Sequence, residues 1–150
     1  MDFEKLVVVY EQLEKISSGN EIRAILSDFF KKVPKEDIGL VSYLTLGKLG
    51  SEFSSPVLGL AEKSVLKSIA RVAGVSENKV KEVIRKRGDA GLAAEELLKK
   101  KPRTLVPVGK LSIHEFFVVL HKIAGTSGSG SQDGKSNLLV GILQKVSPTG

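Results

Sequence analysis

The sequence contains no cysteine among its 150 residues. Disulfide bonds, thiolate zinc sites and cysteine nucleophiles are therefore excluded. It also lacks any run of about eighteen consecutive apolar residues, so it offers no membrane span. The amino terminus has acidic residues before and among its apolar ones, whereas a secretory signal places basic residues ahead of an unbroken apolar core. These absences predict a cytoplasmic protein.

The composition is that of a globular chain, with 41% hydrophobic and 27% charged residues and a length that suits one ordinary domain. The formal net charge is +6, and it is unevenly distributed. Between Lys63 and Arg103 there are twelve Lys or Arg and five Asp or Glu, so the excess positive charge lies in the middle of the chain. Such a run is either a solvated helix face or a surface for a polyanionic partner.

Apolar residues recur with the spacing of amphipathic helices along most of the chain. Ser18 with Glu21, and Ser112 with Glu115, stand in capping-box spacing. The expected helices cover residues 3–13, 22–33, 34–46, 65–73, 77–87, 90–98 and 113–123, with an eighth that has Lys135 in its first turn and buries residues 138–146. This pattern predicts an all-α domain of about eight helices without a significant sheet. The short apolar runs LTLGKLG and FFVVL are also compatible with strands.

The stretch GTSGSGSQDGKS, residues 125–136, ends like a nucleotide-binding P-loop. The spacing Gly-x-x-x-x-Gly-Lys-Ser requires glycine at position 129, where the chain has Ser129. A P-loop also lies between a parallel strand and a helix, which an all-helical chain does not provide. Small residues, hydroxyl groups and a helix that follows at once still suit a phosphate. The alternative is a flexible Gly/Ser linker.

The two histidines, His114 and His121, are seven residues apart and share a helical face. The His-Glu-x-x-His pattern of zinc proteases is broken, because Val118 occupies the second histidine position. We therefore expect both histidines to be structural or surface residues. Neither a Ser-His-Asp triad nor a pair of catalytic carboxylates can be argued from the spacing.

Three segments, in their order and spacing, carry a family resemblance: KRGDAG at residues 86–91, RTL at residues 103–105 and GSGSQDGK at residues 128–135. With the rest of the chain, they resemble the N-terminal DNA-binding domain of archaeal ATP-dependent DNA ligases. The resemblance implies an all-helical domain that holds nicked double-stranded DNA by its backbone phosphates during replication and repair. It also implies that the parent protein uses ATP and Mg, contains further ligase domains and binds a sliding clamp. It implies no cofactor in this segment and no membrane partner.

The same resemblance names the residues expected to contact DNA: Thr126, Ser127, Gly128, Ser129, Gly130, Ser131 and Lys135 first, then Gly88, Asp89 and Gly91, and then Arg103 and Thr104. For any one of them the alternative is an ordinary helix-to-helix turn or a solvated charge run. Relatives tend to carry basic residues where this chain has Gly134 and Asn137. This difference implies a weaker electrostatic grip or one that other residues supply.

Ligases transfer AMP through the lysine of a Lys-x-Asp-Gly motif. The chain has SQDG at residues 131–134, and a hydroxyl group cannot replace the amine that carries AMP. We therefore expect a non-catalytic DNA-binding segment over residues 1–150. We expect it to be truncated at its C-terminal end, with the adenylation and OB-fold domains absent. The alternative function is a basic helical module that binds an acidic protein partner, and a small nucleotide-binding enzyme is the third.

Overall fold

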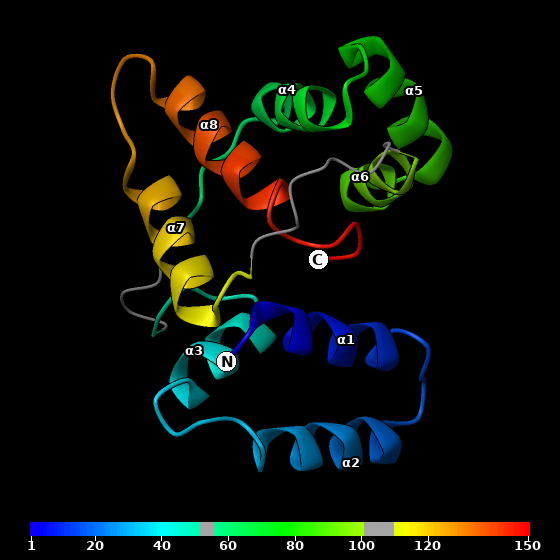
Figure 1. Ribbon diagram of the computed structural model, residues 1–150, viewed down its shortest axis with the longest axis vertical. Coiled ribbons are helices and arrows are strands. Elements are labelled where there is room, and N and C mark those ends of the chain that lie inside the picture. The colour runs from blue at the N-terminus through cyan, green and yellow to red at the C-terminus, as the bar shows by residue number, and fades with distance from the viewer. Residues whose placement is uncertain (52–55, 101–109) are drawn as a thin grey trace.

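The computed structural model describes residues 1–51, 56–100 and 110–150. Within these ranges the chain forms eight helices and no sheet (Figure 1). The helices are α1 (Phe3–Leu13), α2 (Gly19–Phe30), α3 (Ile38–Thr45), α4 (Glu62–Ala73), α5 (Glu77–Arg87), α6 (Ala90–Lys99), α7 (Ile113–Gly125) and α8 (Ser131–Leu143). The all-α prediction is confirmed. The run LTLGKLG begins in α3 and continues into a turn, and FFVVL lies within α7.

Capping residues set several of these boundaries. The Ser76 hydroxyl accepts a hydrogen bond from the Lys79 N–H at the start of α5. Gly74 and Gly88 end α4 and α5 in the left-handed conformation, with φ of 68° and 80°. The predicted capping box of α7 is present, because Ser112 and Glu115 each bond the backbone N–H of the other. These local signals lie within a few residues of the helix ends that they define.

Several predicted boundaries are wrong. The second helix spans residues 19–30 and not 22–33, and the fourth begins at residue 62 and not at 65. The third helix begins at Ile38 and not at Pro34, because residues 34–37 form a separate turn. In that turn the buried Asp37 carboxylate pairs with the Met1 ammonium at 2.5 Å. The eighth helix begins at Ser131, earlier than expected, so Lys135 lies in its second turn and not in its first.

Two clusters of buried side chains form the core, and α8 contributes to both. Helices α1, α3 and α7 enclose the first cluster, and α4, α5 and α6 enclose the second. Ile142 and Val146 belong to the first cluster, whereas Leu143 packs against the second. In Figure 1, α1–α3 lie at one end of the molecule and α4–α6 at the other, with α8 beside α4. Helix α8 therefore joins the two halves.

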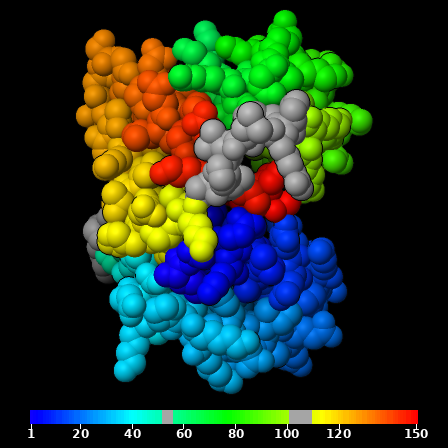
Figure 2. Space-filling model, viewed as in Figure 1, coloured from blue at the N-terminus to red at the C-terminus, as the bar shows by residue number. Residues whose placement is uncertain are grey.

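The last residues of the chain lie between the two halves. Figure 2 shows them, in red, next to α1, in blue. A Cβ atom at Gly150 would lie 3.2 Å from a Val7 methyl group. None of the described helices is both long and apolar enough to cross a lipid bilayer.

Candidate functional site

The 126–131 loop joins α7 to α8 at the upper left of the molecule (Figure 1). Gly128 and Gly130 have φ of 89° and 75°, a left-handed conformation that side chains other than glycine rarely adopt. Residues 127–130 are exposed. Two glycines thus turn the chain sharply and bring bare backbone to the surface immediately before a helix.

The N-terminus of α8 has no side-chain cap. Gly130 occupies the N-cap position and has no side-chain oxygen to offer the first turn, although its carbonyl oxygen accepts the Gly134 N–H. The N–H groups of Gln132 and Asp133 therefore have no acceptor in the described part of the chain. The N–H groups of residues 127–130 have none there either. These open amides, together with the positive end of the helix dipole, favour an anion.

The same segment carries four hydroxyl groups, on Thr126, Ser127, Ser129 and Ser131. The Thr126 hydroxyl donates to the Lys122 carbonyl oxygen at 2.7 Å and is therefore already used. Ser127, Ser129 and Ser131 make no side-chain hydrogen bond to any residue that the structure describes. Three serines of the predicted loop can thus donate to an oxyanion alongside the open amides.

Lys135 does not face solvent with its ammonium group. The residue is 6% exposed, and Nζ donates to the carbonyl oxygens of Leu58 at 2.7 Å and Gly59 at 3.2 Å. A Cβ atom at position 59 would lie 2.9 Å from Nζ of Lys135. The segment around Gly59 can therefore approach the Lys135 side chain this closely only because residue 59 is a glycine. The contact between Lys135 and a phosphate stays a prediction, and the structure gives the ammonium two carbonyl acceptors.

Gln132 acts on the same segment. Its Oε1 atom accepts hydrogen bonds from the Ala61 N–H at 3.0 Å and the Ser64 hydroxyl at 2.9 Å, and its Nε2 donates to the Gly59 carbonyl at 3.1 Å. Gln132 and Lys135 therefore fix the chain that enters α4 against the first turns of α8. The sequence contains no local signal for this contact, because the partners are about seventy positions apart.

Helices α4 and α8 lie side by side and run in the same direction. Bonded pairs rise together along both helices, from Ser64 with Gln132 to Ser68 with Ser136 at 2.8 Å. Both N-termini consequently lie at the same end, next to the 126–131 loop. The Ser68–Ser136 pair is buried, which brings the two backbones close together.

The solvent edge of this contact, which we call the α4–α8 seam, consists of Lys67, Arg71, Asp133 and Asn137. Lys67 pairs with Asp133 at 3.1 Å, and Arg71 Nη1 donates to Asn137 Oδ1 at 2.8 Å. The seam was not among the predicted site residues. Its signal in the sequence is the spacing of basic residues four apart at positions 63, 67 and 71, which places them on one helix face.

The second predicted group lies at the turn between α5 and α6. Gly88 ends α5, and the Asp89 carboxylate caps α6 by accepting from the Leu92 N–H at 2.9 Å. Gly91 lies exposed in the first turn of α6. In Figure 1 this turn lies at the right of the molecule, away from the 126–131 loop. The structure therefore does not bring the two predicted groups together. Arg103 and Thr104 lie outside the described residues.

The positive charges of two basic residues next to that turn are partly neutralised by Glu96. Glu96 receives hydrogen bonds from Lys100 at 2.8 Å and from Arg87 at 2.6 Å. The bond from Lys100, and then that from Arg87, holds the pKa of the Glu96 carboxyl below its ordinary value. Arg87 is therefore a weaker candidate for binding an anion than Arg85 and Lys86 beside it, which make no ion pair with any described residue.

The histidines belong to α7. His121 Nε2 donates to the Leu49 carbonyl at 2.7 Å, and its ring lies 4.7 Å from that of Phe117. His114 is exposed. Across residues 1–51, 56–100 and 110–150, no three His, Cys, Asp or Glu side chains gather in a way that could hold a metal ion.

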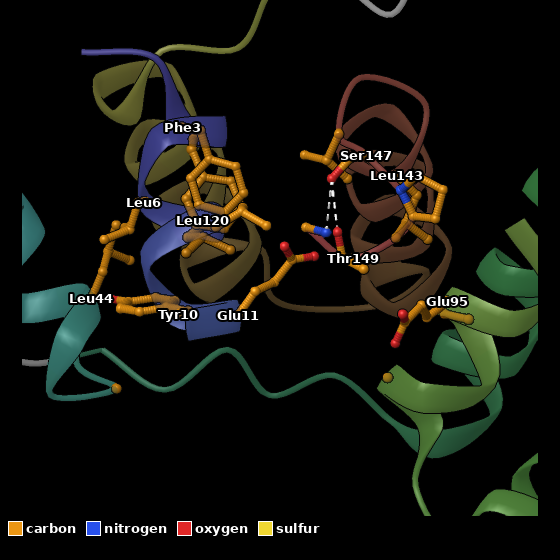
Figure 3. Close-up of a pocket in the computed structure, with 18 of the residues that line it drawn as sticks. Phe3, Leu6, Tyr10, Glu11, Leu44, Glu95, Leu120, Leu143, Ser147 and Thr149 are labelled. Atoms are coloured by element: carbon orange, nitrogen blue, oxygen red, sulfur yellow. Dashed lines mark hydrogen bonds between the residues drawn. The ribbon is translucent and has the colours of Figure 1, made fainter. Parts of the chain in front are cut away.

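A cleft of about 1450 Å³ separates the two halves (Figure 3). Phe3, Leu6 and Leu120 form part of its apolar wall, and Glu11 and Glu95 line it from α1 and α6. Lysines line it as well, so its charges are of both signs. Nothing in this lining selects an anion, whereas the 126–131 loop has open amides and hydroxyl groups. The loop is the candidate site.

The chain was compared with known proteins. The family model described as "DNA ligase N terminus" matches residues 2–150. The chain is 38% identical over 146 residues to DNA ligase 1 of Methanosarcina acetivorans, covering 97% of this chain and 24% of that protein. It is 40% identical over 157 residues to a DNA ligase of Sulfurisphaera tokodaii, covering 99% and 26%. A probable DNA ligase of Persephonella marina is 33% identical over 148 residues, with 99% and 25% covered. The chain spans about a quarter of the length of these relatives.

Proposed function

Because this chain belongs to the DNA ligase N-terminal domain family, we propose that it is the non-catalytic DNA-binding segment of an ATP-dependent DNA ligase. It holds nicked double-stranded DNA by its backbone phosphates, regardless of sequence. The other ligase domains use ATP and Mg to seal the break, and a sliding clamp binds the parent protein. The parent ligase acts in the cytoplasm.

The observation that carries the proposal is the uncapped start of α8. The backbone N–H groups of residues 127–130, 132 and 133 have no acceptor among the described residues, and Ser127, Ser129 and Ser131 carry hydroxyl groups in the same short segment at a positive helix end. Backbone N–H groups and hydroxyl groups recognise phosphate oxygens without reading bases. Lys135 fixes the base of this loop through Leu58 and Gly59. A second group of contacts comprises Gly88, Asp89, Gly91, Arg103 and Thr104.

The composition supports phosphate contact over base stacking. Aromatic residues make up 5% of the chain, and proteins that bind single strands rely on aromatic side chains as stacking platforms. Phosphate contacts position a duplex and carry no direct sequence information. This property suits a protein that must hold a break at any sequence.

The test is a titration of the chain with nicked duplexes of two unrelated sequences at several salt concentrations. We expect equal affinities for the two sequences, and a plot of log association constant against log salt with a slope of about −2 or steeper, because each neutralised phosphate contributes about −0.9. Undetectable or salt-insensitive binding would contradict the proposal. Polyaspartate of matched charge serves as the competitor. If it displaced the duplex at equal charge concentration, the basic helical module for an acidic partner would be favoured instead.

A further inference from the structure

The two cross-helix bonds of the α4–α8 seam differ in charge. Lys67 faces the carboxylate of Asp133, so the two charges compensate each other. Arg71 instead faces the neutral amide of Asn137 and makes no ion pair with any described residue. The guanidinium is exposed and fully charged, since arginine does not lose its proton in proteins. Arg71 is therefore an oriented cation with no counterion in the part of the chain that the structure describes.

The bond to Asn137 leaves most of the guanidinium available. Arginine has five N–H donors in a planar fork, and the structure uses one nitrogen, Nη1, at 2.8 Å. The remaining donors match the spacing of phosphate oxygens. Because Asn137 holds one edge of the fork, less side-chain entropy is lost when the other edge binds a ligand.

The position of Arg71 follows from the geometry of α8. Asn137 lies six residues after Ser131, which is about 9 Å along the helix axis at 1.5 Å per residue. Each strand of duplex DNA carries one charge about every 3.4 Å along the duplex axis. A strand whose phosphate contacts the open amides thus passes within reach of Arg71 if it follows the seam.

We propose that Arg71 binds a second backbone phosphate of the same DNA strand and that Asn137 is the residue that positions it. This inference rests on the proposed function of the 126–131 loop and adds one named contact to it. Lys67 contributes less, because Asp133 already neutralises its charge.

The test compares three single variants with the unmodified chain in the nicked-duplex titration. Arg71→Gln keeps a hydrogen-bonding side chain at the seam and removes the charge. Asn137→Asp keeps the bond to Arg71 and neutralises it. Arg23→Gln is the matched control, because Arg23 on α2 also donates to an asparagine amide, Asn20 Oδ1, at 3.3 Å, at the opposite end of the molecule (Figure 1).

We expect Arg71→Gln and Asn137→Asp each to weaken binding by roughly three- to tenfold at low salt and to make the salt slope shallower by about one. Arg23→Gln should change neither quantity. The melting temperature of each variant is measured by circular dichroism alongside its titration. If the Arg71–Asn137 bond only stabilised the packing of α4 on α8, its loss would alter the melting temperature and leave the salt slope unchanged.

The inference is overturned if the unmodified chain binds with a steep salt slope while both seam variants bind as it does. It is also overturned if Asn137→Asp has no effect, or if Arg23→Gln weakens binding as much as Arg71→Gln. Failure of the proposed function is a different result, because the unmodified chain would then not bind nicked duplex at all.

Discussion

Burial decides what individual polar residues do in this chain. Lys135 completes a Gly-Lys-Ser sequence, but the residue is 6% exposed and its ammonium donates to the carbonyls of Leu58 and Gly59. A buried charge is tolerated only where polar partners replace the lost water. Arg71 and Lys67 are instead exposed to solvent, because they lie at the outer edge of the contact between α4 and α8. The accessible cations of the candidate site are thus on α4 and not in the glycine-rich loop.

Replacing Lys135 by Met tests its structural role. We expect Lys135→Met to lower the free energy of unfolding by about 1.5–3 kcal/mol, because two carbonyl groups lose a charged donor. The measurement is urea denaturation, with Lys63→Met on exposed α4 surface as the control. The salt slope of DNA binding should stay unchanged in the folded variant. A slope shallower by about one would instead assign Lys135 a direct phosphate contact.

Two helix N-termini close in sequence are built in opposite ways. Helix α7 begins with a complete capping box, in which Ser112 and Glu115 satisfy each other's backbone N–H groups. Helix α8 begins at Ser131 with Gly130 as its N-cap, and no side chain among the described residues bonds its first-turn N–H groups. A capped end is closed to ligands, whereas an uncapped end at the surface offers its N–H groups to an anion. The contrast supports the proposed anion site at the start of α8 and offers no such site at the start of α7.

The capping box of α7 makes part of the stability depend on pH. A hydrogen bond from the Ser112 backbone N–H, followed by one from its hydroxyl, holds the pKa of the Glu115 carboxyl below its ordinary value of 4.5. A depressed folded-state pKa contributes stability that is complete above the unfolded pKa and is lost as pH falls through the folded pKa. Glu115→Gln should therefore destabilise the chain at pH 7, and the difference from the unmodified chain should shrink as the pH falls below 4.5.

The measurement is urea denaturation of both proteins across this pH range. Glu36→Gln removes an exposed carboxylate that makes no hydrogen bond with any described residue, and it serves as the control. A difference between the Glu115 variant and the unmodified chain that stayed constant as the pH fell below 4.5 would contradict the role of the carboxylate charge.

At the scale of the whole molecule, α8 couples two separate cores. One of its faces supplies Ile142 to the cluster of α1, α3 and α7, and Leu143 packs against the cluster of α4, α5 and α6. The same helix carries the open amides and half of the seam. Neither half can therefore unfold without disturbing the candidate site.

This coupling predicts one unfolding transition for both halves. Ile123→Val in the first cluster and Ile69→Val in the second remove one methylene from nearly inaccessible sites, 0% and 2% exposed. Each should cost about 0.5–1.5 kcal/mol. Each should lower the same melting temperature by a few degrees, at about 2–4 °C per kcal/mol for a chain of this size. Calorimetry checks this, and two separate transitions that respond to one variant each would contradict the coupling.

Most of the helices were predictable from the sequence because their causes are local. Ser112 and Glu115 are three residues apart, and Gly88 ends α5 directly after its last residue. The start of α3 was not predictable, because the chain's own amino terminus holds Asp37 from 36 positions away. The 126–131 loop was found from its glycines and serines. The seam was missed because its bonds cross between helices.

The sequence by itself determined the all-α class and the absence of cysteine chemistry, since composition and periodicity need no long-range contact, and its similarity to DNA ligases showed the family. The tertiary structure alone decided which polar groups near α8 remain available. Gln132, Asp133, Lys135 and Asn137 all bond to partners between 66 and 77 positions away, in α4 or in the segment that leads into it. Such contacts depend on how two helices pack, and packing follows from the whole core and not from a local pattern.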